Sequence, residues 1–143
     1  MTAPAALPLF CLPVRVYWED TDAGGVVFYA NYLKYFERAR TEWLRQAGIG
    51  QQTLKETEGA IFVVAEATVK YLQPARLDDA IEVSVLSAVA SRASLQVQQQ
   101  ARRCTGPASS TLLCEASIHI ACVDHTTFRP RRIPSDVLDR LLP

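Results

Sequence analysis

Hydrophobic positions along the chain change their spacing, and each change predicts a different element. Over residues 13–19 apolar and polar residues alternate, which is typical of a β-strand. From Asn31 onwards the apolar residues recur at helical spacing until Gly48, so this segment is predicted to be the longest helix. A shorter helix is predicted over residues 50–58, with Leu54 as its only large apolar residue.

The second half of the chain has the two-residue spacing of β-strands. Four runs with this spacing are separated by turn-forming segments, and they cover residues 61–73, 80–90, 93–103 and 111–123. Four successive strands predict an antiparallel meander. In the last run every second residue from Leu112 to Cys122 is apolar, which indicates one face turned towards a core. A short amphipathic helix is predicted over residues 135–142.

A strand, a long helix and four more strands pack most simply as one strongly curved antiparallel sheet wrapped around the helix, which is an α+β fold. The prediction is a single domain over residues 13–143 behind an N-terminal tail of residues 1–12. A sheet of this kind leaves open edges, and an association that continues the sheet between subunits would protect them. We therefore expect at least a dimer.

The composition narrows the classes of function. Lysine and arginine together number 15, aspartate and glutamate also number 15, and the formal net charge is zero. A chain without net charge and with arginines scattered along its sequence disfavours non-specific nucleic-acid binding, which depends on a net positive field. No apolar run approaches the roughly 18 residues of a membrane-spanning helix. The opening segment lacks the basic start of a signal peptide and the four cysteines form no CxxC pair, which together favour the cytoplasm.

The most unusual segment runs from Glu19 to Gly25 and joins the first strand to the long helix. Backbone N–H groups at a helix start have no partner within the helix, and glycines let a ligand approach the backbone closely. The carboxylate of Asp22 beside such N–H groups could attack an acyl carbon or activate water, while the N–H groups stabilise the oxyanion. The segment therefore predicts an acyl-transfer site.

A thioester is the acyl substrate that best suits a site with one carboxylate and no evident general acid. A thiol with a pKa of about 8.5 leaves as a thiolate without help from a general acid. The sequence has no GxSxG or HExxH motif, and its only histidines are His119 and His125, which disfavours a Ser-His-Asp mechanism. His119 and Cys122 differ in strand parity and are expected on opposite faces, so we predict no metal site and no cofactor.

The aspartates of this segment also have interpretations without acyl chemistry. The sequence Asp20-Thr21-Asp22 could form an Asx turn that caps the helix. A calcium loop counted from Asp20 is excluded, because Gly24 stands at its fifth position and Asn31 at its last. An aspartyl phosphotransferase is disfavoured, because antiparallel strands follow the motif instead of alternating helices and parallel strands.

A longer stretch carries a family resemblance. Residues 16–48, VYWEDTDAGGVVFYANYLKYFERARTEWLRQAG, resemble the signature of the 4-hydroxybenzoyl-CoA thioesterase-like hotdog-fold family, in particular its Tol-Pal-associated acyl-CoA thioesterase branch. The later segment VKYLQPARLDDAIEV is similar to the second and third strands of that family. The resemblance implies a hotdog fold, a five-stranded curved antiparallel sheet wrapped around a long central helix, in homodimers or homotetramers that act on acyl-CoA.

The resemblance also implies roles for single residues. Asp22, the second aspartate of the DxD pair, would be the catalytic carboxylate, acting as nucleophile or as general base. A backbone N–H near Tyr29 would receive the thioester oxygen, and Gly25 would permit the turn. Trp18 and Tyr29 are pocket candidates; the branch commonly has tyrosine and histidine at these positions, so the acyl preference stays open. Arg92 is expected to contact the CoA phosphates.

The predicted function is therefore hydrolysis of acyl-CoA thioesters to a free acid and CoA. The alternative is a module that binds an acyl thioester or an acyl-carrier protein without turnover, because a fold does not guarantee a chemistry. Aliphatic and aromatic acyl groups both fit these observations.

Overall fold

The computed structural model describes residues 7–107 and 109–143. Its elements, in chain order, are β1 (Phe10–Arg15), a 3-10 turn η1 (Trp18–Asp20), α1 (Asn31–Gln46), α2 (Gln51–Glu58), β2 (Ala60–Tyr71), β3 (Ala80–Ala90), β4 (Ser94–Gly106), β5 (Ser109–Asp124) and α3 (Ser135–Leu141). The helices and the four later strands lie close to their predicted bounds. Part of the predicted tail, residues 1–6, lies outside the described residues, whereas residues 10–12 belong to β1.

The first strand differs from its prediction. It ends at Arg15 and does not continue to residue 19. The N–H of Val16 donates to the carbonyl of Asp79 (3.0 Å), and the chain then tightens into the 3-10 turn. In the sequence, apolar and polar residues continue to alternate through the residues of this turn. Their spacing alone therefore did not show where the strand ends.

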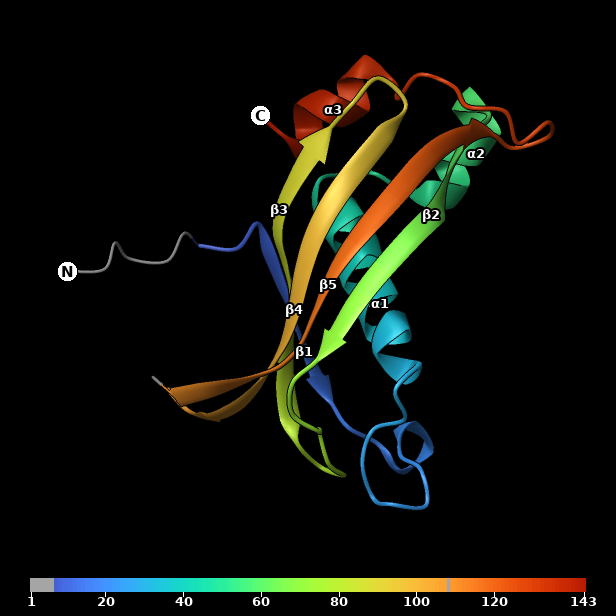
Figure 1. The fold of residues 1–143 in the computed structure, drawn as a ribbon. Helices are drawn as coiled ribbons and strands as arrows, with labels where there is room; N and C mark the ends of the chain where they lie inside the picture. The colour runs from blue at the N-terminus through green and yellow to red at the C-terminus, as the bar shows by residue number, and fades with distance from the viewer. Residues whose placement is uncertain (1–6, 108) are drawn as a thin grey trace.

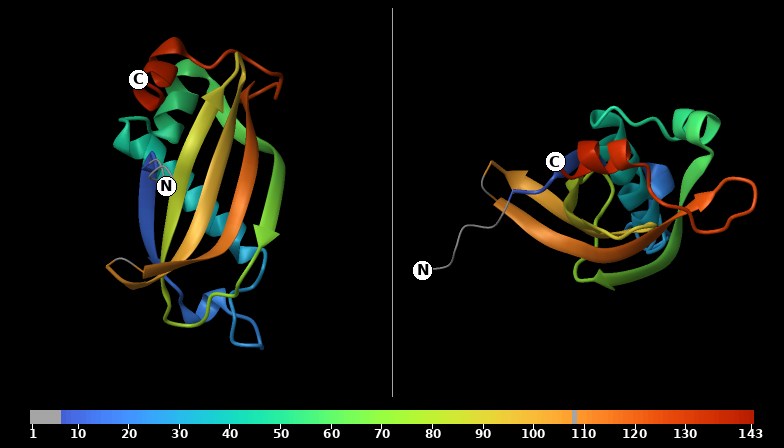
Figure 2. Two further views of the ribbon diagram at one scale, coloured as in Figure 1. Left: turned by 60° about the vertical axis from the view of Figure 1, so that its left-hand side comes forward. Right: turned by 90° about the horizontal axis from the view of Figure 1, so that it is seen from above.

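The five strands form one antiparallel sheet in the order β1-β3-β4-β5-β2 (Figure 1). The sheet curves strongly, and α1 lies across its concave face, as the two further views in Figure 2 show. Helix α1 packs mainly against β1 and β3, on one side of the concave face. The predicted α+β architecture, a curved five-stranded sheet around a long helix, is confirmed.

The predicted four-strand meander is wrong for its first strand. Only β3, β4 and β5 follow one another in the sheet, whereas β2 pairs with β5 and forms the opposite edge from β1. The connection from β2 to β3 is too long for a tight hairpin, and its backbone is bonded elsewhere: Val27 donates to Ala75 O (2.8 Å) and Asp78 donates to Val16 O (3.0 Å). The connection therefore carries the chain past the start of α1 to the other side of the sheet.

The core confirms most of the predicted apolar faces. On α1 the buried apolar residues are Tyr32, Tyr35, Phe36, Ala39, Trp43 and Leu44. On β5 the predicted face is buried from Cys114 to Cys122, but at its start Leu113 is buried in place of Leu112. Ala101 of β4 pairs with Cys114 and Arg102 pairs with Leu112, so Leu113 is an extra residue in β5, and this bulge reverses the parity of β5 there. Within the described residues, no helix is long and apolar enough to cross a membrane.

Candidate active site

The segment between β1 and α1 folds into a narrow hairpin. The N–H of Asp22 donates to the carbonyl of Val26 (2.9 Å), and the N–H of Gly25 donates to the carbonyl of Asp22 (3.0 Å). One step further from the tip, Thr21 and Val27 form an isolated β-bridge. Gly25 has φ of 77°, in the left-handed region that favours glycine. The hairpin thus places Asp22 at the tip, on the limb opposite to the one that leads into α1.

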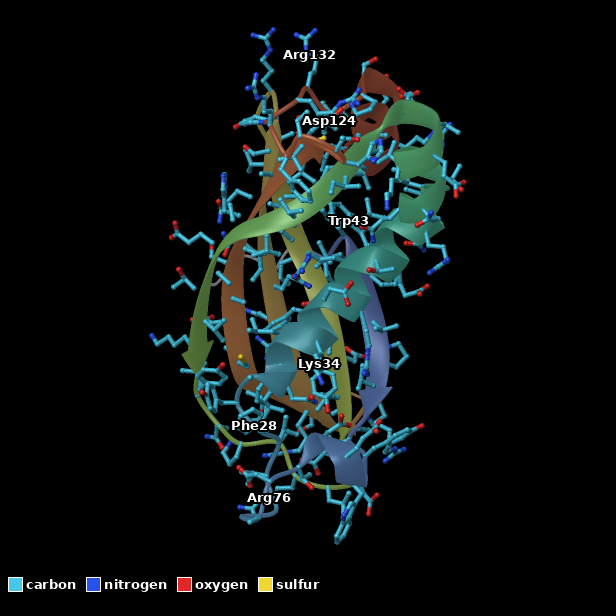
Figure 3. The ribbon with its side chains drawn as sticks, turned by 90° about the vertical axis from the view of Figure 1, so that its right-hand side faces the viewer. Phe28, Lys34, Trp43, Arg76, Asp124 and Arg132 are labelled. Atoms are coloured by element: carbon cyan, nitrogen blue, oxygen red, sulfur yellow. The ribbon has the colours of Figure 1, made fainter. Side chains whose placement is uncertain are left out.

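Residues at the end of β2 and in the β2–β3 connection form hydrogen bonds with the hairpin and with the start of α1. Val26 forms a β-bridge with Arg76. The hydroxyl of Tyr71, at the end of β2, donates to the carbonyl of Tyr29 (2.8 Å), and the N–H of Ala75 donates to the hydroxyl of Tyr32 (3.1 Å). These segments, distant in sequence, meet at the start of α1, the end of the molecule where Figure 3 labels Phe28 and Arg76.

The Asp22 carboxylate is exposed and only partly engaged. Its Oδ1 accepts the N–H of Gly24 (2.8 Å), which forms an Asx turn at the tip of the hairpin. The Asx turn considered from the sequence was expected to cap the helix, and no side chain among the described residues caps α1. No hydrogen bond to Oδ2 of Asp22 is found among the described residues. One oxygen therefore shapes the turn, and the other is open to a ligand.

The sequence predicted backbone N–H groups without acceptors at the start of α1, and the structure agrees with this only in part. The N–H groups of Asn31 and Leu33 pair with the carbonyls of Phe28 (2.8 Å) and Ala30 (3.2 Å). The N–H of Tyr29, just before the helix, has no acceptor among the described residues. The N–H groups of Ala30 and Tyr32 also have no acceptor among the described residues, so open donors lie both in the loop and in the first turn of α1. Tyr29 is the residue that the resemblance indicated as oxyanion donor, and that role stays a prediction.

A pocket of about 300 Å³ lies beside Tyr29. It is lined by Val27, Tyr29, Tyr32, Tyr71, Leu72, Gln73 and Pro74. The rings of Tyr32 and Tyr71 meet edge to face, with centroids 5.6 Å apart. Asp22 is not part of this lining. Trp18, the other pocket candidate, is 79% exposed and also lies outside it. The sequence did not single out Tyr71, because a lone tyrosine at the end of a strand carries no chemical pattern.

The structure does not bring Arg92 to Asp22 within one chain. Arg92 lines a separate pocket of about 650 Å³ together with Arg131 and Arg132. Figure 3 labels Arg132 at the end of the molecule opposite to Phe28 and Arg76. Helix α1, which runs between these two ends, is itself about 24 Å long, at 1.5 Å for each of its 16 residues. Arg92 therefore belongs to a second, basic region of the surface.

Asp20, the first aspartate of the pair, is 6% exposed and was not given a role from the sequence. Its Oδ2 accepts the N–H of Tyr17 (2.8 Å) and its Oδ1 accepts the side-chain amide of Asn31 (3.0 Å). Burial alone would raise the pKa of Asp20, but these hydrogen bonds and the charge of Arg38 lower it overall. The buried Tyr35 hydroxyl faces the same carboxylate and contributes to the lowered pKa, without a hydrogen bond of ordinary geometry.

Residues 16–141 match the sequence model of the thioesterase-like superfamily. This match covers most of the chain, and the protein belongs to that superfamily. The family resemblance inferred from the sequence is thereby confirmed.

Relatives with curated names extend the match over nearly the whole chain. Acyl-CoA thioester hydrolase YbgC from Escherichia coli is 45% identical over 130 residues, which cover 91% of this chain and 93% of that protein. Acyl-CoA thioesterase YbgC from Haemophilus influenzae is 42% identical over 128 residues, 90% of each chain. The crystal structure of a 1,4-dihydroxy-2-naphthoyl-CoA thioesterase from Synechocystis superimposes with a TM-score of 0.82 at 21% identity, covering 92% of this chain and 94% of that one. The last similarity shows a shared fold.

Proposed function

We propose that this protein hydrolyses acyl-CoA thioesters to a free acid and CoA, with the carboxylate of Asp22 driving the reaction. The observation that carries the proposal is the hairpin, which presents an unengaged carboxylate oxygen and the unpaired N–H of Tyr29 on one short loop. The similarity to proteins named acyl-CoA thioesterases supports the same reaction class. Because CoA thioesters are cytoplasmic metabolites, the proposal includes a cytoplasmic location.

The groups present suit two routes to the same products. In the first, an oxygen of Asp22 attacks the thioester carbon, CoA leaves as a thiolate, and water hydrolyses the resulting acyl anhydride. In the second, Asp22 takes a proton from water as the water oxygen attacks the thioester carbon. In both routes the N–H of Tyr29 donates to the oxygen that becomes negative in the transition state. The thiolate needs no general acid to leave.

The proposal includes a second copy of the chain beside β2. This edge strand presents unpaired backbone groups, and its Val64 side chain is 50% exposed. Because α1 packs towards β1 and β3, the β2 side of the concave face lacks full cover, and a pocket lies there between Arg40 of α1 and Phe62 and Val64 of β2. An antiparallel partner would bring its Arg92 region towards the Asp22 hairpin, where it could hold CoA phosphates. A homodimer is the smallest assembly that meets this requirement, and a homotetramer would contain it.

A charge on the β2 edge tests this assembly. Ala67 is an exposed residue of β2, and Ala67→Lys places a cation where a neighbouring strand would pair. We expect the variant to sediment as a monomer in analytical ultracentrifugation and to lose most of its turnover. Val89→Lys is the control, because Val89 is 68% exposed but lies on the interior strand β3. A variant at Ala67 that stays dimeric would show that the copies associate elsewhere.

Release of free thiol tests the reaction itself. The purified protein is offered short aliphatic, long aliphatic and aryl CoA esters, and also an acyl-carrier-protein thioester, with a thiol-reactive dye as the readout. We expect catalytic release from at least one CoA ester. If calorimetry detects binding of these ligands while none releases thiol, the protein is instead a non-catalytic module that binds acyl thioesters or acyl-carrier protein.

A further inference from the structure

Three residues around the Tyr29 peptide form a closed ring of hydrogen bonds. The side-chain amide of Asn31 donates to Oδ1 of Asp20 (3.0 Å). The N–H of Phe28 donates to the carbonyl of Asp20 (3.0 Å), and the N–H of Asn31 donates to the carbonyl of Phe28 (2.8 Å). Each residue is thus bonded to the other two. Tyr29 lies between Phe28 and Asn31 in the chain, and Asp22 lies two residues beyond Asp20.

The two residues that contribute side chains to the ring are buried, and the ring carries one negative charge. Asp20 is 6% exposed and Asn31 is 7% exposed. The groups that face the carboxylate are the N–H of Tyr17, the amide of Asn31, the Tyr35 hydroxyl and the guanidinium of Arg38. Because these groups lower the pKa of Asp20, it stays ionised at neutral pH and accepts both of its hydrogen bonds. A buried, charge-assisted hydrogen bond of this kind holds its partners in one geometry.

We propose that Asp20 and Asn31 are positioning residues for thioester hydrolysis, which hold the N–H of Tyr29 in a fixed place relative to the Asp22 carboxylate. Neither residue touches the substrate in this inference, which rests on the proposed function. The physical reason is geometric. The ring joins the limb that carries Asp22 to the limb that carries Tyr29, and small errors in such placement cost large factors in rate.

A purely structural role would have a different consequence. If the ring only anchored the start of α1, its loss would lower the free energy of unfolding and leave the folded fraction fully active. If it positions the Tyr29 N–H, its loss lowers kcat in molecules that are still folded and still bind CoA. The separation of kcat from stability and from CoA affinity therefore distinguishes the two roles.

The test exchanges the donor and the acceptor of the ring. Asn31→Asp places two carboxylates about 3 Å apart, where Asp20 and Asn31 meet in the native protein. We expect kcat to fall roughly 10- to 100-fold, with the Kd for CoA unchanged. Asp20→Asn combined with Asn31→Asp restores one donor and one acceptor, and the amide oxygen introduced at position 20 can still accept the N–H of Tyr17. The double variant is therefore expected to recover most of the lost kcat.

The pH profile supplies a readout that mere destabilisation would not produce. Two adjacent carboxyl groups share a proton as the pH falls, because repulsion raises one of their pKa values. The shared proton recreates a donor and an acceptor, so the ratio of Asn31→Asp activity to native activity is expected to rise towards low pH. The double variant is expected to show a flat ratio. Gln46→Glu, at an exposed position on the same helix, adds the same charge and serves as the control.

Each outcome of the experiment is decisive. Native protein without thioesterase activity contradicts the proposed function and, with it, the inference. Active native protein together with a fully active Asn31→Asp variant contradicts the positioning role alone. If Asn31→Asp does not fold by circular dichroism, Asn31→Ala replaces it, because it removes the donor without adding a charge. An Asn31→Ala variant with native kcat, or a double variant as slow as the single one, contradicts the inference.

Discussion

Asp22→Asn is expected to lower the turnover of acyl-CoA at least about 100-fold while the fold and CoA binding are retained. The amide oxygen of asparagine can still accept the N–H of Gly24, so the Asx turn survives the substitution. What disappears is the negative charge on the open oxygen, which both proposed routes require. The measurement is kcat for acyl-CoA hydrolysis, with circular dichroism and the Kd for CoA as checks on folding and binding.

Asp136→Asn is the matched control for this variant. Asp136 lies on α3 and is exposed, so the same chemical change there is expected to leave kcat unaltered. An Asp22→Asn enzyme that keeps native turnover would exclude Asp22 as nucleophile and as general base. Solvent oxygen-18 found in the enzyme after a single turnover would further separate the two routes, because only the anhydride route can pass solvent oxygen into the carboxylate.

Gly25→Val is expected to reduce kcat roughly 10- to 100-fold, through the position of Asp22 and not through its chemistry. Gly25 has φ of 77° and donates its N–H to the carbonyl of Asp22. A β-branched residue is strongly disfavoured in this left-handed region, so the hairpin tip must rearrange. Steady-state kinetics on the folded variant measure the effect.

Two further variants determine whether backbone conformation is the cause. Gly25→Asn places a side chain in the same site, but asparagine adopts left-handed conformations more readily, so it should retain more activity than Gly25→Val. Gly106→Val serves as the control, because Gly106 lacks a positive φ and a Cβ there would meet no atom of the described residues within 4 Å. Equal losses for the valine and asparagine variants at Gly25 would show that side-chain bulk, and not φ, determines the effect.

Much of the fold could be predicted because its elements carry local patterns. The apolar spacing of α1 and the alternation in β3, β4 and β5 report directly which faces are buried. The pairing of β2 with β5 could not be predicted in this way, because β2 contains no local signal for its partner. That pairing depends on where residues 72–79 are held by the hairpin and by β1.

The candidate site was likewise predictable from the sequence only in part. The DxD motif and the glycines singled out the segment from Glu19 to Gly25, because an unusual composition marks an unusual turn, whereas the hairpin itself was not predicted and the role of Asp22 stays a prediction. The unpaired N–H of Tyr29 was expected in this region, but its isolation depends on which carbonyls pair with Asn31 and Leu33. The buried ring through Asp20 and the hydroxyl of Tyr71 remained unrecognised, because each depends on residues brought together from separate segments.

The sequence by itself determined the α+β class, the long helix, the later strands and the unusual segment that carries Asp22. These features follow from the periodicity of burial and from turn chemistry, which act over a few neighbouring residues. Only the tertiary structure decided the strand order, the register shift beside Leu113 and the separation of Arg92 from Asp22. Such features depend on contacts between distant segments, where packing and hydrogen bonding of the whole chain select one arrangement from several that the local patterns allow.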